Sequence, residues 1–353
     1  MSNSEGCVRQ YIWQEMRDRP VRVSFTVFIT EYSKMGRWLQ LLETGTNEPA
    51  SDENQYFVPT EVLQHIDMGK FRRGQMFFQR NLFQCIIAML TSLVAGLSVK
   101  NLLDVLVATE KSSTARTSFF RYLHTFHHLL KWHYGNVFDT ASSAGVSIQK
   151  VREMHCSARK LMHSLDKAPS KLCADVFCCH GNMYVSQYDM AVVQSGFFGA
   201  VIMHPREMGI NCSVAELDDY VYFWRWIGYL LGLRDKYNIC IGGYQNAYDI
   251  CKEIEQEIII PALDNPPRHF NEMAQAFTDG LNLFAMVPLY STPSVLGRGY
   301  DMINRKAPFK LSFKDKCRKA VLSLLVSAVF YVPVFSKLCN WSIEKAFACH
   351  RIT

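Results

Sequence analysis

The sequence predicts an all-α protein built as a single large helical bundle. Apolar residues recur at helical spacing over long stretches, whereas the alternation typical of half-buried strands is rare. Apolar residues make up 49% of the chain and charged residues only 20%, a balance that excludes disorder over most of the length. With 353 residues the chain is long enough to bury a large core.

The helical pattern and its interruptions suggest how the chain is organised. Helical periodicity runs through residues 76–108, 117–134, 148–166, 214–233, 245–261 and 269–285. Polar breaks at 48–55 and 142–147 and a proline-punctuated turn at 264–270 separate these stretches, and the best strand-like pattern, at 21–28, is short. We expect an N-terminal segment over 1–55, a helical domain over 56–290 and a C-terminal extension over 291–353.

Composition narrows the class of protein. A net charge of +6 without a dense basic face argues against nucleic acid as a partner. The twelve cysteines form no C-x-x-C pair and lie mostly in apolar runs, so we expect reduced thiols facing the cytosol. The "CCH" cluster at 178–180 is expected to be a loop rather than a metal site. The first 25 residues contain no apolar core of a secretory signal, which indicates an intracellular protein.

Two segments raise the question of a membrane. Residues 81–99 carry no charge, a length that is marginal for a transmembrane helix and also suits a core helix. Residues 314–337 begin with a basic collar and continue with an uncharged stretch that Pro333 interrupts. An anionic leaflet would favour such a collar. A packed bundle helix and a membrane-associated helix both remain open for this second segment.

The clearest candidate site is the helical stripe "VREMHCSARKL" at 151–161. Arg152, His155 and Arg159 share one helix face, so two permanent cations flank one imidazole. In the preceding helix, Arg121, His124, Thr125 and His128 share a face in the same way. Paired stripes of this kind suit an anionic, metal-containing ligand held between two helices.

Histidines on neighbouring helices raise three hypotheses for a metal centre: zinc, di-iron and haem. A zinc site would pair His124 with His128 and take His155 or a carboxylate as third ligand, but the H-E-x-x-H pattern is missing. A di-iron bundle requires Glu-x-x-His motifs, and the spacing of Glu153 and His155 does not provide one. A haem needs an axial imidazole, cations for its propionates and an apolar cavity. No C-x-x-C-H occurs, so such a haem would be b-type and not covalently attached.

Charge explains why arginines would flank such an imidazole. A propionate forms charge-assisted hydrogen bonds with a guanidinium, which stays charged when it is dehydrated. An imidazole must be neutral to ligate iron, and neighbouring cations lower its pKa in that direction. A salt bridge from either arginine to a protein carboxylate is the alternative role. The aromatic run "FWRWIGYLLG" at 223–232 is expected to pack in the core, with a substrate channel as its alternative.

These motifs resemble a known family. "R-x-x-H-x-x-x-R" (152–159) preceded by "R-x-x-H-T" (121–125) is similar to the catalytic core shared by bacterial rubber oxygenase and the fungal ER-bound oxygenase of mycophenolic acid biosynthesis. "DMGKFRRGQMFFQRN" (67–81), "GFFGAVIMHPREMGI" (196–210) and "SVAELDDYVYFWRWIGYLLGLRDKYN" (213–238) fit the same pattern. The resemblance covers roughly residues 60–290.

The resemblance implies a globin-related helical core that binds haem b and uses O2 to cleave a carbon–carbon double bond in an isoprenoid chain. His155 would be the proximal iron ligand, Arg152 and Arg159 would hold the haem, and Arg121 and Thr125 would lie on the distal side. His124 stands where rubber oxygenase has a distal lysine, so it is a candidate second iron ligand. The family's distal glutamate falls on Val105, beside Asp104, which leaves the catalytic base unassigned.

We therefore expect a haem-dependent oxygenase that acts on an unsaturated lipid or isoprenoid and associates with an intracellular membrane, the endoplasmic reticulum by family resemblance. One alternative is a non-catalytic haem- or lipid-binding protein in which His124 and His155 both ligate the iron. A second alternative is a membrane-associated helical bundle without a cofactor.

Overall fold

The fold is all-α, as the sequence predicts. The computed structural model describes residues 37–51, 56, 58–166 and 183–349. Within these residues all regular structure is helical, apart from one isolated antiparallel bridge between Pro49 and Ser186. The strand-like pattern at 21–28 and the "CCH" cluster at 178–180 lie outside the described residues. The globin-related core implied by the family resemblance stays a prediction.

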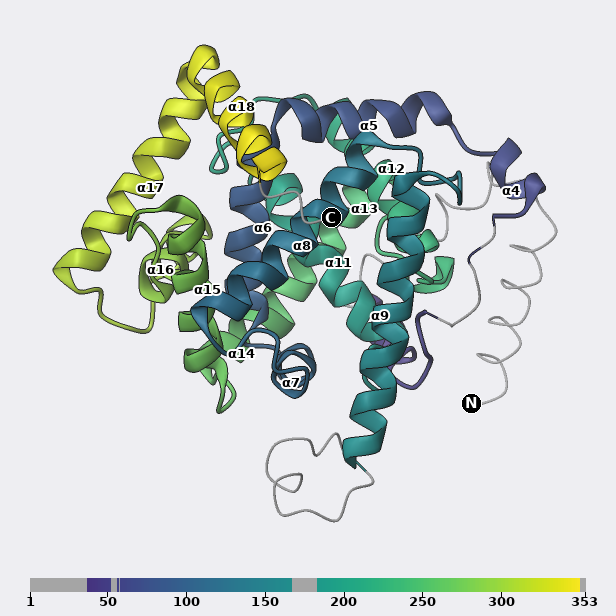
Figure 1. Cartoon of the computed structure of the whole chain (residues 1–353), viewed down its shortest axis with the longest axis horizontal. Helices are drawn as coiled ribbons and strands as arrows, with labels where there is room; N and C mark the ends of the chain where they lie inside the picture. Colours follow the sequence, from purple (N-terminus) through teal and green to yellow (C-terminus); the bar gives the residue numbers. More distant parts are fainter. Residues whose placement is uncertain (1–36, 52–55, 57, 167–182, 350–353) are drawn as a thin grey trace.

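Most consecutive helices of the described chain are joined by short connections (Figure 1). Their bounds are α3 (Arg37–Glu43), α4 (Thr60–Gln64), α5 (Met68–Arg80), α6 (Leu82–Gly96), α7 (Lys100–Ala108), α8 (Ala115–Tyr134), α9 (Ser143–Asp166), α11 (Gln187–Met203), α12 (Val214–Leu230), η1 (Asp235–Tyr237), α13 (Tyr244–Ile254), η2 (Glu255–Ile259), α14 (Ile260–Asp264), α15 (Phe270–Ala285), α16 (Thr292–Met302), α17 (Phe313–Tyr331) and α18 (Pro333–Cys349).

The expected boundaries were partly wrong. The stretch 76–108 is not one helix, because Asn81 ends α5 and a further break before Lys100 separates α6 from α7. The expected polar break at 142–147 is mostly helix: α9 begins at Ser143, and the Ser142 hydroxyl accepts a hydrogen bond from the Gly145 amide. The stretch at 245–261 is interrupted by a π-helical turn, a feature often found at functional sites.

Side-chain caps fix where several helices begin. Thr114, Ser186, Ser213, Ser291 and Ser312 each accept a hydrogen bond from the amide three residues later, and that third residue bonds back to the cap. These capping boxes satisfy amides that would otherwise lack partners at a helix start. They therefore set the starting points of α8, α11, α12, α16 and α17.

The core lies around α6, α11 and α12, which are buried along most of their length. The aromatic run in α12 packs as expected, with Trp224, Trp226 and Leu230 at most 5% exposed. Helix α5 lies closely against α12 because Gly74 has no side chain: a Cβ there would stand 2.4 Å from the Asp219 carbonyl oxygen. The core role of α6 also explains why residues 81–99 lack charge.

No single helix in the described part of the chain is long and apolar enough to cross a bilayer. Two bent pairs pass that test of length and composition only when each pair is taken together. These pairs are α5 with α6, bent by 86°, and α17 with α18, bent by 114°.

Candidate haem site

A large cavity lies between α8 and α9 and extends towards α6, α11, α12 and α16. Its volume is about 1400 Å³, which exceeds the usual range of about 300–1,000 Å³ for small-molecule pockets. Aliphatic and aromatic side chains dominate the lining. Exposed lining residues, among them Phe120, His124 and Met154, mark an opening along the facing sides of α8 and α9.

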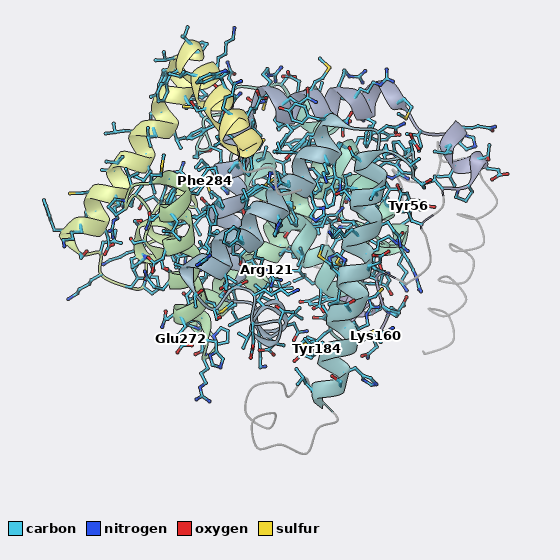
Figure 2. All side chains as sticks on the ribbon, in the orientation of Figure 1. Tyr56, Arg121, Lys160, Tyr184, Glu272 and Phe284 are labelled. Atoms are coloured by element: carbon cyan, nitrogen blue, oxygen red, sulfur yellow. The ribbon has the colours of Figure 1, made fainter. Side chains whose placement is uncertain are left out.

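Four of the six predicted site residues line this cavity: Arg121, His124 and Thr125 from α8, and His155 from α9. Figure 2 labels Arg121 near the middle of the molecule. The other two, Arg152 and Arg159, do not belong to the lining and point elsewhere. The two stripes read from the sequence are therefore brought together only in part.

The register of the two helices places His155 near Arg121. The Nδ1 atom of His128 in α8 lies 2.6 Å from the Ser147 hydroxyl in α9. Because an α-helix rises about 1.5 Å per residue, His155 lies roughly 12 Å along α9 from Ser147. The same distance back along α8 from His128 reaches Phe120, adjacent to Arg121.

His155 is held in one neutral tautomer. Its Nδ1 atom lies 3.2 Å from the Ser51 hydroxyl oxygen, and that hydroxyl donates its single proton to the Leu231 carbonyl at 2.6 Å. The Ser51 oxygen must then accept from His155 Nδ1–H, which leaves a lone pair on Nε2. Nε2 has no hydrogen-bond partner among the described residues. Burial, followed by the charges of Arg159 and Arg152, lowers the pKa of His155 to about 4.

Both flanking arginines bind backbone carbonyls. Arg152 donates to the Leu230 carbonyl at 3.0 Å, and Arg159 donates to the carbonyls of Ser51 and Val185 at 2.9 and 3.0 Å. The carbonyls of Ser51 and Leu230 belong to the two chain segments that hold the His155 imidazole. The arginines therefore position the imidazole and lower its pKa, while the predicted contact with propionates remains a prediction.

Ser51 was missed by sequence reasoning, and it can approach the imidazole because of a glycine in the facing segment. Gly232 has φ +91°, and a Cβ there would stand 2.9 Å from the Ala50 carbonyl oxygen and 3.0 Å from Ser51 Cα. Only a residue without a side chain fits both the backbone conformation and the close contact. Ser51 lies in a stretch that reads only as a polar break, so no sequence signal pointed to it.

Arg121 is the guanidinium that lines the cavity. Its Nη1 atom donates to the Thr109 hydroxyl at 2.9 Å, and no carboxylate of the described chain forms an ion pair with it. Burial lowers its pKa, as expected for a cation without a nearby anion. Thr125 donates to the Arg121 carbonyl at 3.1 Å and keeps lone pairs free to accept. This wall of the cavity is suited to an anionic group.

His124 and His128 differ in their surroundings. His124 is exposed at the opening and makes no hydrogen bond within the described part of the chain. His128 lies deeper: Trp132 donates to the Ser147 hydroxyl, which is then free to donate to His128 Nδ1. The Ser147 hydroxyl is thus shared between the Trp132 indole and the His128 imidazole. Burial, with a smaller contribution from Lys131, lowers the pKa of His128 to about 4.

The catalytic base stays unassigned. Val105 lines the cavity, as expected for the family's distal position, but it carries no ionisable group. The neighbouring Asp104 is outside the lining and binds Lys100 Nζ at 2.5 Å and the Tyr184 hydroxyl at 3.0 Å. Within the described residues no three histidine, cysteine or acidic side chains converge as metal ligands. The zinc hypothesis therefore lacks its third ligand in this part of the chain.

Residues 80–238 match a family model described as the catalytic domain of the ER-bound oxygenase mpaB/B′ and rubber oxygenase. The match covers less than half of the chain and shows that this region is similar to that oxygenase family. No curated protein and no solved structure matches the chain.

The mpaB/rubber oxygenase region runs from the end of α5 to just beyond η1 and contains all six predicted site residues. Ser51, which hydrogen-bonds the His155 imidazole, precedes the match, and helices α13 to α18 follow it. The chain thus completes its candidate site with a residue from outside the family domain.

Proposed function

We propose that the protein is a haem b-dependent oxygenase that cleaves a carbon–carbon double bond in an unsaturated lipid or isoprenoid chain. The observation that carries this proposal is the His155 imidazole, which lines a large apolar cavity, is neutral and fixed through Nδ1–H, and has no hydrogen-bond partner on Nε2 in the described chain. A metal-ligating histidine characteristically donates its other ring N–H in this way.

The cavity residues fit a haem in three respects. His155 offers the axial nitrogen, the apolar lining suits the macrocycle, and Arg121 supplies a cation without a carboxylate partner in the described chain. A bound haem would supply an iron that binds O2. Cleavage of C=C by O2 gives two carbonyl groups that contain both oxygen atoms, so the overall reaction needs no external electron donor.

The chain's own residues would control access and orientation. The apolar walls would exclude water and align an extended hydrocarbon, while the His128 imidazole and the Thr125 hydroxyl provide polar contacts inside the cavity. The opening between α8 and α9, next to Phe120 and Met154, would admit the apolar substrate. Such substrates reside in bilayers, and we place the protein at an intracellular membrane, that of the endoplasmic reticulum.

The decisive experiment loads the purified protein with haem and follows both spectrum and product. A Soret band with a pyridine-haemochrome of b type is expected for the native chain, and the His155→Ala variant is expected to lose haem. His163→Ala, an exposed histidine of the same helix, is the matched control. With ¹⁸O2 and an isoprenoid, both carbonyl products should carry label.

The alternative function gives a different result. His124 and His155 line the same cavity, so both could bind one iron in a non-catalytic haem protein. That protein would show a six-coordinate spectrum, form no CO adduct and consume no O2 with any isoprenoid. A chain that takes up no haem would contradict both functions.

A further inference from the structure

The two C-terminal helices form a projecting V. Helices α17 and α18 meet at a 114° bend and extend away from the bundle at one edge (Figure 1). We call residues 331–334 at the bend, Tyr331, Val332, Pro333 and Val334, the apolar apex. All four are exposed, with Tyr331 72% and Val334 76% accessible to solvent.

The exposed apolar surface continues along both arms of the V. In α17, Leu324 is 68% exposed and lies two turns before Tyr331 on the same face. In α18, Val334, Leu338 and Trp341 follow at i, i+4 and i+7, and Leu338 and Trp341 are 54% and 56% exposed. A surface helix normally presents polar residues on its outer face, so this apolar face lacks a partner within the described chain.

Acidic residues of the V lie only near its base, Asp315 in the first turn of α17 and Glu344 near the end of α18, and Asp315 and Asp301 pair with Arg318 and Lys319. From Lys316 to Ile343 the sequence contains no aspartate or glutamate but has four basic residues, Lys316, Arg318, Lys319 and Lys337. Close to the apex, Lys337 is exposed, and the Arg206 guanidinium lies 5.8 Å from the centre of the Phe330 ring. Apolar residues at the apex with the cations Lys337 and Arg206 beside them complement an anionic surface with an apolar interior.

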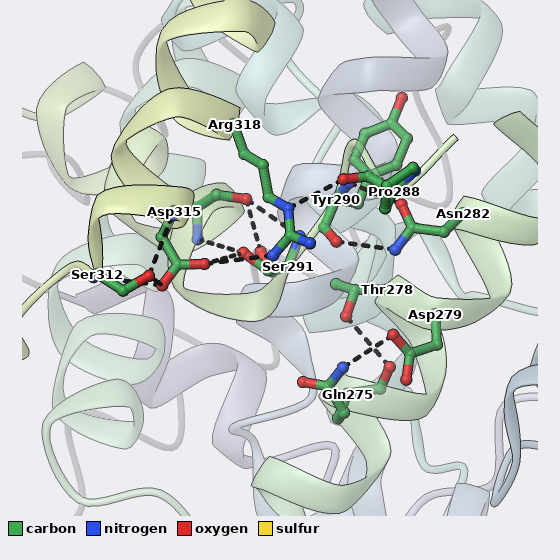
Figure 3. A network of polar contacts seen from close by, with 11 residues as sticks. Gln275, Thr278, Asp279, Asn282, Pro288, Tyr290, Ser291, Ser312, Asp315 and Arg318 are labelled. Atoms are coloured by element: carbon green, nitrogen blue, oxygen red, sulfur yellow. Dashed lines mark hydrogen bonds and ion pairs between the residues drawn. The ribbon is translucent and has the colours of Figure 1, made fainter. Parts of the chain in front are cut away.

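The base of the V is firmly held while its apex is free. Asp315 accepts hydrogen bonds from the hydroxyls of Ser291 and Ser312 at 2.7 and 2.5 Å, and Arg318 donates to the Pro288 carbonyl at 2.9 Å (Figure 3). In α18, Phe347 is only 5% exposed and its ring packs near Phe126 of α8. The projecting shape is thus supported at both ends.

Both supports lead to helices that line the cavity. Helix α17 packs on α16, whose Leu296 and Tyr300 belong to the cavity lining, and α18 ends against α8, which carries Arg121 and His124. A surface bound by the V would therefore lie next to helices that enclose the candidate haem site.

We propose that α17 and α18 form a membrane-binding wedge whose apolar apex enters one leaflet of an anionic bilayer. The apex would reach roughly 5–10 Å into the boundary between headgroups and acyl chains, as interfacial helices do. Trp341, about 10 Å along α18 from Val334 at 1.5 Å per residue, would lie at headgroup level, where tryptophan is enriched. This inference rests on the proposed membrane supply of substrate but requires no haem.

Vesicle flotation of the full chain tests the wedge. The native protein should co-float with vesicles of phosphatidylcholine that contain 30% phosphatidylserine. The fraction of protein bound to vesicles of phosphatidylcholine alone should be several-fold lower. The Val334→Glu variant should lower the bound fraction by roughly tenfold, since burying a valine side chain contributes that much. A glutamate in the first turn of α18 suits the helix dipole, so the helix itself should be retained.

The matched control is Val146→Glu, which places the same charge on an exposed valine, 55% accessible, in the first turn of α9. It should float like the native chain. As a second readout, vesicles of brominated lipid should quench tryptophan fluorescence in the native protein and not in Trp341→Phe. The other described tryptophans are at most 8% exposed, so they contribute little to this difference.

Each outcome decides the proposal. Equal flotation of native chain and Val334→Glu, or no flotation of either, would overturn it. Sedimentation without lipid tests the alternative that a second copy of the chain covers the apex. A native dimer that Val334→Glu dissociates, together with no vesicle binding, would show this alternative and overturn the wedge. The assay works equally with haem-free protein, so failed flotation says nothing against the oxygenase, and failed haem uptake says nothing against the wedge.

Discussion

The Nδ1 atom of His155 lies 3.2 Å from the hydroxyl oxygen of Ser51, although 104 residues separate the two in the chain. The Ser51 hydroxyl donates its hydrogen bond to the Leu231 carbonyl, so the imidazole is the donor in the pair with Ser51. Arg159 binds the Ser51 carbonyl, and Arg152 binds the Leu230 carbonyl next to Leu231. The imidazole is oriented by a network that begins outside the family domain.

The Ser51→Ala variant should therefore weaken haem binding without unfolding the chain. Loss of the partner of a metal-ligating histidine typically lowers affinity about 10- to 100-fold. Haem titration measures this change, and resonance Raman of the iron–imidazole stretch should show a weaker bond. Ser118→Ala is the matched control, since Ser118 is fully buried and its hydroxyl has no partner in the described chain. Equal affinity for both variants would remove Ser51 from the site.

The Gly232→Ala variant should reduce both stability and haem affinity. Its φ of +91° is costly for alanine, by about 1–3 kcal/mol, and the new Cβ would push against Ala50 and Ser51. Gly196→Ala is the control: nothing lies within 4 Å of its Cβ position in the middle of α11, so a gain of about 0.5–1 kcal/mol in stability is expected. Urea unfolding measures both changes. Equal stabilities would contradict the strain at Gly232.

The sequence predicted the helices with the strongest apolar periodicity and the histidines on them, because both depend on local spacing. It placed α8, α12 and α15 within two residues of their observed starts, and it identified the cavity-lining Arg121, His124, Thr125 and His155. Motif resemblance identified the family domain that matches residues 80–238.

Contacts between segments that are distant in the sequence could not be predicted from local spacing. Nothing in the spacing of Arg152 and Arg159 distinguishes a propionate from a backbone carbonyl as the acceptor, and only the folded chain brings the carbonyls of residues 51, 185 and 230 to them. Likewise, the break between α5 and α6 depends on Asn81, whose side chain donates to the Phe77 carbonyl, a capping contact that apolar periodicity does not encode.

Acidification should destabilise the haem-free chain. The pKa is lowered to about 4 for His155 and to about 3 for His133, in each case first by burial. Between these values and the ordinary pKa of about 6.5 the unfolded chain binds more protons than the folded one, so stability falls as pH falls through this window. Each histidine adds up to about 1.4 kcal/mol per pH unit to the slope.

The His133→Phe variant isolates one of these contributions. His133 is fully buried and its ring stacks on Phe78 with centroids 3.6 Å apart, so phenylalanine suits the same aromatic environment. The unfolding free energy of the variant should depend less steeply on pH between pH 6.5 and pH 4. The reduced slope should correspond to about one proton fewer taken up on unfolding. Denaturant unfolding at a series of pH values gives the slope. An unchanged slope would mean that His133 is not neutral in the fold under these conditions.

The identity of the distal imidazole can be decided by comparing His124→Ala with His128→Ala. His128 is held through Nδ1 by Ser147, whereas His124 has no hydrogen bond in the described chain and can turn a lone pair inwards. His124→Ala should retain haem but change the ferric spectrum from six- towards five-coordinate and speed CO binding. His128→Ala should leave the coordination unchanged. The reverse result would assign the distal ligand to His128, and two unchanged spectra would mean that neither imidazole reaches the iron.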